Sequence, residues 1–220
     1  MQSLVKILHV LLFWILIWLM ENYYLALTEN YKQVYFIDAK DNKKTVTLIS
    51  IGSLVLTFLV AYVCFLFIDL SVLKSILDRD NLLVPYLIFL ASMFVYIVLH
   101  ELVHGAAYKA LTHQKLTFGF TLAVAFCGVP NIYTSRKTAM ISLIAPFAVF
   151  TALFIPAMVV CYNINLMYYV FVALLFSIHF GGCIGDLYMF VLLLFKYKQK
   201  ELLMRDTGPA QTLYLPSDMC

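Results

Sequence analysis

A short stretch in the middle of the chain, VLHELVHGAAYK (residues 98–109), carries two histidines and a glutamate at the end of an apolar run. On an α-helix, residues four apart point in nearly the same direction, so the imidazoles of His100 and His104 can bind one cation. Glu101, beside the first histidine, can reach a water on that cation. Two histidines on zinc with a glutamate as general base form the HExxH arrangement of hydrolytic zinc sites. The spacing therefore predicts a zinc (Zn²⁺) centre in which Glu101 activates the zinc-bound water.

An alternative interpretation treats His100 and His104 as structural side chains that hydrogen-bond to carbonyl groups, with Glu101 paired to one of them. Ionisable side chains are costly at bilayer depth, and those that occur there usually serve a function. An acid with two basic neighbours in an apolar run therefore favours the metal site.

Zinc hydrolases usually have three protein ligands and leave the fourth position to water. Besides Glu101, the only acidic residue between Asp80 and Glu201 is Asp186, in the apolar segment SIHFGGCIGDLYMF. An unpaired carboxylate there would be costly, so it must meet a cation or a hydrogen-bond donor. We predict Asp186 as the third ligand, the alternative being a hydrogen bond to a Ser, Thr or Tyr. His179, seven residues earlier on the same helix face, is the rival ligand, or else supports a ligand or contacts substrate.

The composition defines the environment of this site. The 220-residue chain is 64% hydrophobic and 12% charged, with a mean hydropathy of +0.92. Soluble domains are about 45–50% apolar and about 25% charged, so the solvent for this chain must be a lipid bilayer. The five cysteines are scattered without a CxxC pair, which argues against a disulfide framework and a thiolate zinc site. We expect no nucleic-acid partner and no soluble cofactor.

Five apolar segments are long enough to cross a bilayer, which takes about 20 residues. They cover residues 4–20, 46–68, 84–107, 139–161 and 166–195. The first runs into ENYY rather than a small-residue cleavage site, which predicts a retained helix. The last is longer than a crossing needs, so we expect a tilt or a break near Gly181, Gly182 and Gly185. The predicted fold class is all-α: a polytopic membrane protein of about five transmembrane helices in one domain, residues 1–200, with a short tail, residues 201–220.

The connection between the third and fourth segments, residues 116–138, differs from the rest of the chain. LTFGFTLAVAF is rich in β-branched and aromatic residues, and CGVPNIYTSRK supplies turn residues and then charge. The connection is too short for another spanning hairpin, so we expect a short β-hairpin or re-entrant segment beside the active site. An exposed strand edge there would bind an extended peptide by β-addition, and the alternative is an interfacial loop without a substrate role.

Lysine and arginine positions predict the orientation. With five spans, the connections 21–45 and 108–138 and the carboxyl tail share one side, and each carries four basic residues. The other side has Lys6, Lys74 and Arg79. The positive-inside rule then puts the amino terminus outside and the carboxyl tail in the cytoplasm, with the histidines near the cytoplasmic face. We expect a multi-pass protein of the cell membrane, the plasma membrane of a bacterium.

Four features together resemble the putative zincin peptidase family, which is similar to the intramembrane site-2 proteases. They are HELVHG at the end of a span, the FGF…AFCGVPNIYTSRK connection, a helix opening ISLIAPF, and a later helix carrying Gly185-Asp186. The resemblance covers about residues 85–195. It implies His100 and His104 as zinc ligands, Glu101 as the catalytic acid/base and Asp186 as the third ligand. Site-2 proteases usually carry this aspartate in the order Asp-Gly, which is reversed here, and this chain has no PDZ-like insert.

These observations predict a zinc-dependent intramembrane peptidase that hydrolyses a peptide bond of a membrane-embedded protein or peptide substrate. Glu101 takes a proton from the water and later passes it to the leaving amine. Water must reach the site, so we expect a polar cavity open to the cytoplasm. Two alternatives remain: a non-catalytic membrane protein that binds or carries a metal through the same His/Asp cluster, and a scaffold or regulatory partner of a larger complex.

Overall fold

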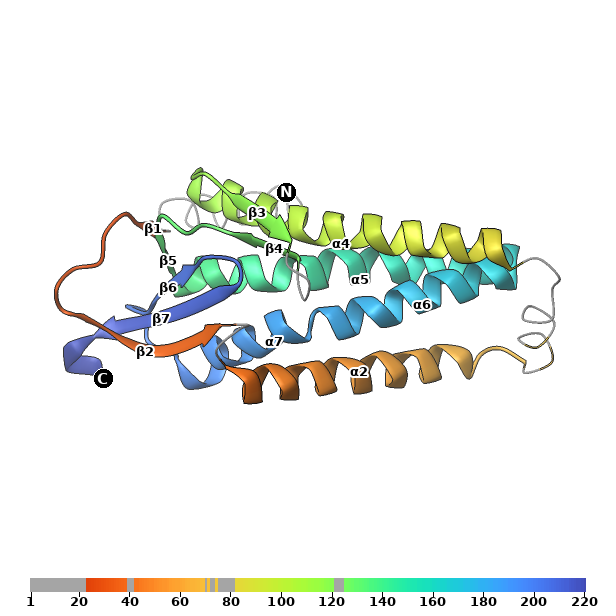
Figure 1. Ribbon diagram of the computed structural model, residues 1–220, viewed down its shortest axis with the longest axis horizontal. Helices are drawn as coiled ribbons and strands as arrows, with labels where there is room; N and C mark the ends of the chain where they lie inside the picture. The colour runs from red at the N-terminus through yellow and green to blue at the C-terminus, as the bar shows by residue number, and fades with distance from the viewer. Residues whose placement is uncertain (1–22, 39–41, 70, 72–73, 75–81, 121–124) are drawn as a thin grey trace, which may run out of the picture.

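Four helical segments of the described chain are long and apolar enough to cross a membrane. The computed structural model describes all residues except 1–22, 39–41, 70, 72–73, 75–81 and 121–124. The four segments are α2 (Lys43–Phe65), α4 (Leu83–Thr112), α5 (Arg136–Ile164) and Leu166–Lys196, which contains α6 (Leu166–Gly182), α7 (Ile184–Val191) and the π-helical turn η1 (Leu192–Lys196). Figure 1 shows them side by side. They correspond to four of the five predicted spans, and the first predicted span, residues 4–20, lies outside the described residues.

A five-stranded antiparallel sheet lies at one end of the helices, so the all-α prediction is wrong (Figure 1). Its order is β1-β5-β6-β7-β2. The strands are β1 (Tyr23–Tyr24), β2 (Tyr31–Asp38), β5 (Tyr133–Ser135), β6 (Leu203–Asp206) and β7 (Ala210–Pro216), and a short 3₁₀ turn η2 (Ser217–Met219) follows. The longest pairing runs from Tyr31 opposite Pro216 to Asp38 opposite Ala210. Residues 201–220, expected as a tail, thus supply two strands of this sheet.

The sheet joins regions that are far apart in the sequence. β1 and β2 come from the connection 21–45, β5 from the connection 108–138, and β6 and β7 from the carboxyl end. Because these strands hydrogen-bond to one another, the three lysine- and arginine-rich regions lie at the same end of the helices. The predicted orientation assumes that these three regions are on one side of the membrane.

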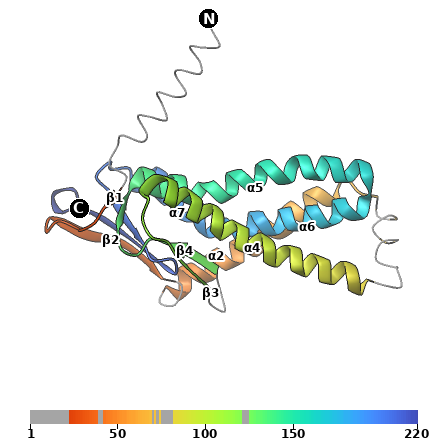
Figure 2. The ribbon, with the colours of Figure 1, turned by 90° about the horizontal axis from the view of Figure 1, so that it is seen from above.

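The predicted hairpin between the third and fourth spans is present. β3 (Thr117–Phe120) pairs antiparallel with β4 (Ala125–Gly128), and β4 packs beside α4 (Figure 2). The ring of Phe126 lies between Gly119 of β3 and Gly208 of the β6–β7 turn, where a Cβ atom on either glycine would collide with it. Gly208 also has a φ of +94°, which favours glycine. The hairpin is therefore docked onto the turn of the larger sheet.

The last spanning segment is interrupted at Cys183, which confirms the break expected near its glycines. A Cβ atom at Gly181 would collide with Thr57 and come within 2.8 Å of the Ser53 carbonyl oxygen, so this glycine lets α2 approach α6 closely. The interruption places Asp186 in the first turn of α7.

Three apolar clusters are buried among the described elements, and the two larger ones join the helices to one another and to the sheet. Leu143, Met189, Leu193, Met204 and Leu213 join α5, α7 and η1 to the sheet. A second cluster joins α2 to α6 and contains Cys64, Tyr169, Ala173 and Phe176. The sheet and the helices thus share a core at the end where the predicted metal ligands lie.

Candidate metal centre

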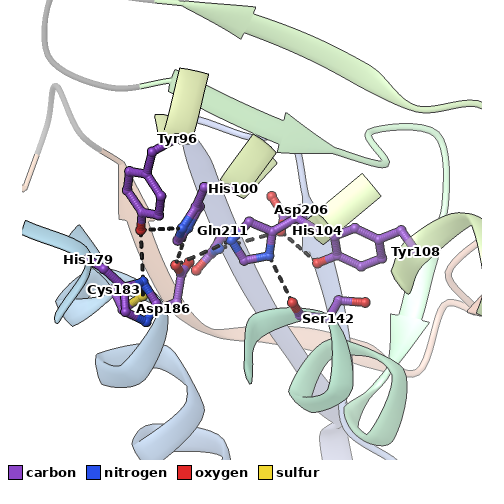
Figure 3. Close-up of polar contacts among 10 residues, drawn as sticks. All are labelled: Tyr96, His100, His104, Tyr108, Ser142, His179, Cys183, Asp186, Asp206 and Gln211. Carbon is purple, nitrogen blue, oxygen red and sulfur yellow. Dashed lines mark hydrogen bonds and ion pairs between the residues drawn. The ribbon is translucent and has the colours of Figure 1, made fainter. Parts of the chain in front are cut away.

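Helix α4 carries a buried polar residue at every fourth position: Tyr96, His100, His104 and Tyr108. A spacing of four puts these side chains on one face of the helix. His100 and His104 are only 8% and 7% exposed to solvent, and the centroids of their imidazole rings lie 5.0 Å apart. Figure 3 shows this row of side chains facing residues from α5, α6 and α7.

Asp186 reaches this row from α7. Its Oδ2 atom lies 3.3 Å from Nε2 of His100 and 3.3 Å from Nε2 of His104 (Figure 3). The structure thus brings together the three predicted metal ligands. His179 lies elsewhere, because its Nδ1 atom is 2.9 Å from the hydroxyl oxygen of Tyr96, on the other side of His100.

The second ring nitrogen of His104 identifies its tautomer. Nδ1 is 2.8 Å from the carbonyl oxygen of Ser142 in α5, and a carbonyl only accepts hydrogen bonds, so Nδ1 carries a proton. This carbonyl lacks its usual helical donor because Pro146, four residues later, has no N–H group. In its neutral form, the His104 ring therefore presents a lone pair on Nε2 to a metal ion at the Asp186 carboxylate.

Two facing acceptors at this distance require a cation between them. A proton on one ring satisfies one contact, whereas a central metal ion satisfies both imidazoles and the carboxylate at once. Tetrahedral zinc with bonds of about 2.0 Å separates its ligands by about 3.3 Å, which matches both N–O distances. Two imidazoles and one carboxylate, with a fourth position open, are a donor set of hydrolytic zinc sites. His100, His104 and Asp186 therefore fit a zinc ion.

These donors open onto a cavity of about 290 Å³ that Glu101 also lines. Glu101 is half-buried and its carboxylate accepts a hydrogen bond from the backbone N–H of Cys127 in β4. Gly182 and Gly185 line the same cavity, and a Cβ atom at either would meet nothing within 4 Å, so these glycines leave space beside Asp186. Burial raises the pKa of the Cys127 thiol to about 12, so without a metal ion this side chain stays protonated near neutral pH.

Asp206 in β6 also lines the cavity, and the sequence reasoning missed it. Its carboxylate accepts hydrogen bonds from the Tyr108 hydroxyl at 2.7 Å, the Gly208 backbone N–H at 2.8 Å and the Gln211 amide at 3.4 Å. Burial raises the pKa of Asp206 to about 6, against the opposing effect of the bonds from Tyr108 and Gly208. Two signals pointed to it: Tyr108 follows His104 by one turn, and a Thr-Gly-Pro turn separates LLMRD from AQTLYLP.

A second group of possible ligands lies beside the first. Ligand atoms of His100, His179 and Cys183 lie within 4.8 Å of one another. The Tyr96 hydroxyl oxygen, however, lies between the two histidines, 3.1 Å from Nδ1 of His100 and 2.9 Å from Nδ1 of His179. The hydroxyl hydrogen-bonds to both rings, which satisfies this group without a metal.

Comparison with known proteins agrees with this geometry. Residues 93–200 match the model of a family described as putative zincin peptidase, and the matched region contains His100, Glu101, His104 and Asp186. No curated protein and no solved structure is significantly similar to the chain. The family description points to a zinc metallopeptidase, in keeping with the donor set of the site. Residues 93–200 of this chain are therefore similar to the putative zincin peptidase family.

Proposed function

We propose that this protein is a zinc-dependent intramembrane peptidase that hydrolyses a peptide bond of a membrane-embedded substrate. One observation carries the proposal: Nε2 of His100 and Nε2 of His104 lie at equal distances of 3.3 Å from the Asp186 carboxylate, beside Glu101, in helices apolar enough to cross a membrane. Ionisable groups gathered at such a depth are expensive to maintain unless they act together.

His100, His104 and Asp186 would hold the zinc ion. When bound, zinc supplies a Lewis acid that acidifies water and polarises a carbonyl group. Glu101 provides the base: its carboxylate lines the same cavity and takes a proton from water, then returns it to the leaving amine. The hydrogen bond from the Cys127 backbone holds the Glu101 carboxylate at the edge of β4.

The substrate would enter as an extended segment beside β4. Ala125, Phe126 and Cys127 of this strand line the cavity that contains the donors. A peptide bond can be cleaved only where the backbone is unwound, and a strand edge offers N–H and C=O groups that hold an unwound backbone by β-addition. A strand edge at membrane depth is tolerated where it lines a polar cavity, and β4 meets this condition.

The decisive experiment separates catalysis from metal binding. Glu101→Gln keeps the size and the hydrogen-bond acceptor but cannot act as a base, and a base of this kind contributes about 10²–10⁴-fold in rate. We expect new peptide termini within membrane proteins, found by mass spectrometry, in cells that express the wild type and not in cells that express Glu101→Gln. Glu29→Gln, the same change at an exposed residue, should behave as wild type.

Zinc content of the detergent-purified protein completes the test. Wild type and Glu101→Gln should hold one zinc per chain, and His104→Ala should lose it. Equal termini in all cells with zinc retained would replace the peptidase with a non-catalytic metal-binding protein. If the purified wild-type protein contains no zinc, a scaffold or regulatory role would explain the protein better than a peptidase.

A further inference from the structure

The Tyr96 hydroxyl connects His100 to a second buried histidine. Its oxygen lies 3.1 Å from Nδ1 of His100 and 2.9 Å from Nδ1 of His179 (Figure 3). Tyr96 is 6% exposed and His179 is completely buried. A hydroxyl group has one proton to donate, so it donates to one of these rings and accepts from the other.

His179 lies in an apolar cage. The rings of Phe147, Phe150, Phe154, Phe176 and Phe180 all have centroids between 5.6 and 6.4 Å from the centroid of its imidazole. Because water is excluded from such a cage, the ring nitrogens must find their partners in the protein.

The partners of His179 settle which of its nitrogens carries the proton. Nε2 lies 3.2 Å from the Thr151 hydroxyl oxygen, and the ring also hydrogen-bonds to the backbone of Phe147, one turn earlier in α5. A backbone carbonyl only accepts hydrogen bonds, so the nitrogen on the α5 side is Nε2–H. Nδ1 of the neutral His179 ring is then an acceptor. The Tyr96 hydroxyl, at 2.9 Å, is the stronger and closer donor to it than the Cys183 thiol, whose Sγ lies at 3.5 Å.

The direction of this bond determines the tautomer of His100. Since Tyr96 donates to His179, its oxygen accepts from Nδ1–H of His100, and the lone pair of His100 is left on Nε2. That nitrogen faces Asp186 at 3.3 Å. The chain Thr151–His179–Tyr96 therefore does for His100 what the Ser142 carbonyl does for His104: each holds a proton on Nδ1 and exposes Nε2 to the metal position.

We propose that Tyr96 and His179 are positioning residues, which fix the tautomer and the ring orientation of His100 as a metal ligand. This inference rests on the proposed function only in requiring a metal at His100, His104 and Asp186. Partners of this kind typically raise metal affinity by about 10–100-fold.

Tyr96→Phe tests the proposal because it removes only the hydroxyl group. Zinc affinity of the detergent-purified full chain, measured by competition with a chelator, should fall about 10–100-fold. The control is Tyr169→Phe, which removes another buried hydroxyl: that of Tyr169 donates to the Cys64 carbonyl at 2.8 Å, away from the site. We expect Tyr169→Phe to bind zinc as tightly as wild type.

Two substitutions of His179 test whether its hydrogen-bond acceptor, rather than the bulk of its side chain, is what supports zinc binding. His179→Leu removes the acceptor and should weaken zinc binding as much as Tyr96→Phe. His179→Asn puts an amide oxygen close to the position of Nδ1 and should restore most of the affinity. Because the two residues act as one chain, the combined variant Tyr96→Phe with His179→Leu should lose no more than either single variant.

Each contrary outcome has a definite meaning. If wild type binds no zinc, the proposed function fails. If wild type binds zinc and Tyr96→Phe binds it equally tightly, or if the two tyrosine variants lose the same affinity, the positioning role fails while the proposed function stands. Equal losses in both His179 variants would also overturn it. Two zinc ions per chain, with one lost in Cys183→Ser, would mean that His100, His179 and Cys183 bind a metal instead.

Discussion

The two histidines of α4 obtain the same tautomer by different means. His104 donates to a main-chain carbonyl, which α5 offers because Pro146 cannot donate to it. His100 depends on a side-chain hydroxyl whose direction is set by His179. A proline inside a helix usually produces a kink, but at this position its missing N–H group also leaves the Ser142 carbonyl available to His104 of the candidate metal centre.

Pro146→Ala should weaken zinc binding without weakening the fold. The alanine N–H can bond to the Ser142 carbonyl in the normal helical pattern and competes with His104 for it. We expect zinc affinity to fall about 10-fold or more. Alanine is the better helix former by about 3 kcal/mol in an ordinary helix interior, so the unfolding temperature should not decrease.

Pro156→Ala supplies the matched control, because Pro156 also lies inside α5. It should leave zinc affinity at the wild-type level. Chelator competition and thermal unfolding in detergent measure both quantities, and an equal loss of affinity in the two variants would exclude the role of the Ser142 carbonyl.

At the scale of the elements, the sequence predicted the features that depend on nearby residues, and it missed the sheet, whose strands come from distant parts of the chain. The histidines, Glu101 and the β3–β4 hairpin depend on neighbours within one helix or one turn, and their spacing made them visible. β6 and β7 pair with β5 and β2, more than 65 positions away in the chain, as in Ser135 opposite Leu203. The β6–β7 hairpin leaves a local signal in its Thr-Gly-Pro turn, but the pairing with β5 and β2 leaves none, which is why the sheet and Asp206 were missed.

The β6–β7 turn is attached to α4 through a carboxyl group with an unusual pKa. Burial raises the pKa of Asp206 to about 6, above its ordinary value of 3.8. Between these two values the folded protein binds more protons at this group than the unfolded chain does. The contribution of Asp206 to stability is therefore fully present below about pH 4 and is lost as the pH rises through 6.

Asp206→Asn should remove this pH dependence, because the amide does not titrate, while its one oxygen still accepts a hydrogen bond from either Tyr108 or Gly208. The free energy of unfolding of wild type relative to Asp206→Asn should decrease from pH 4 to pH 7.5, by about 2 kcal/mol. Denaturant unfolding of both proteins in the same detergent measures the difference at each pH. A difference that does not change with pH would show that Asp206 does not titrate in this range.

At the scale of the whole molecule, the sheet and the candidate metal centre lie toward the same end of the helices. The cavity contains residues from α4 and α7 together with residues from β4, β6 and the β6–β7 turn. The matched family region covers residues 93–200, so the parts of the cavity wall from β2 and α2, and from β6, β7 and the turn between them, lie outside that region. These parts are where features particular to this chain are expected.

The last prediction concerns the side of the membrane that this end faces. Three regions with four basic residues each contribute strands to the sheet, and Lys74 follows α2, at the opposite end of that helix. The positive-inside rule then puts the sheet, the cavity and the carboxyl end in the cytoplasm. Cys220 is an exposed cysteine close to the sheet and serves as a native probe.

In intact cells a membrane-impermeant thiol reagent should leave Cys220 unlabelled, and permeabilisation should make it reactive. Ser71→Cys, made in a Cys220→Ser background at an exposed position beyond α2, should give the reverse result and be labelled in intact cells. Labelling of Cys220 in intact cells would place the cavity on the outer side and exclude a site supplied with water from the cytoplasm.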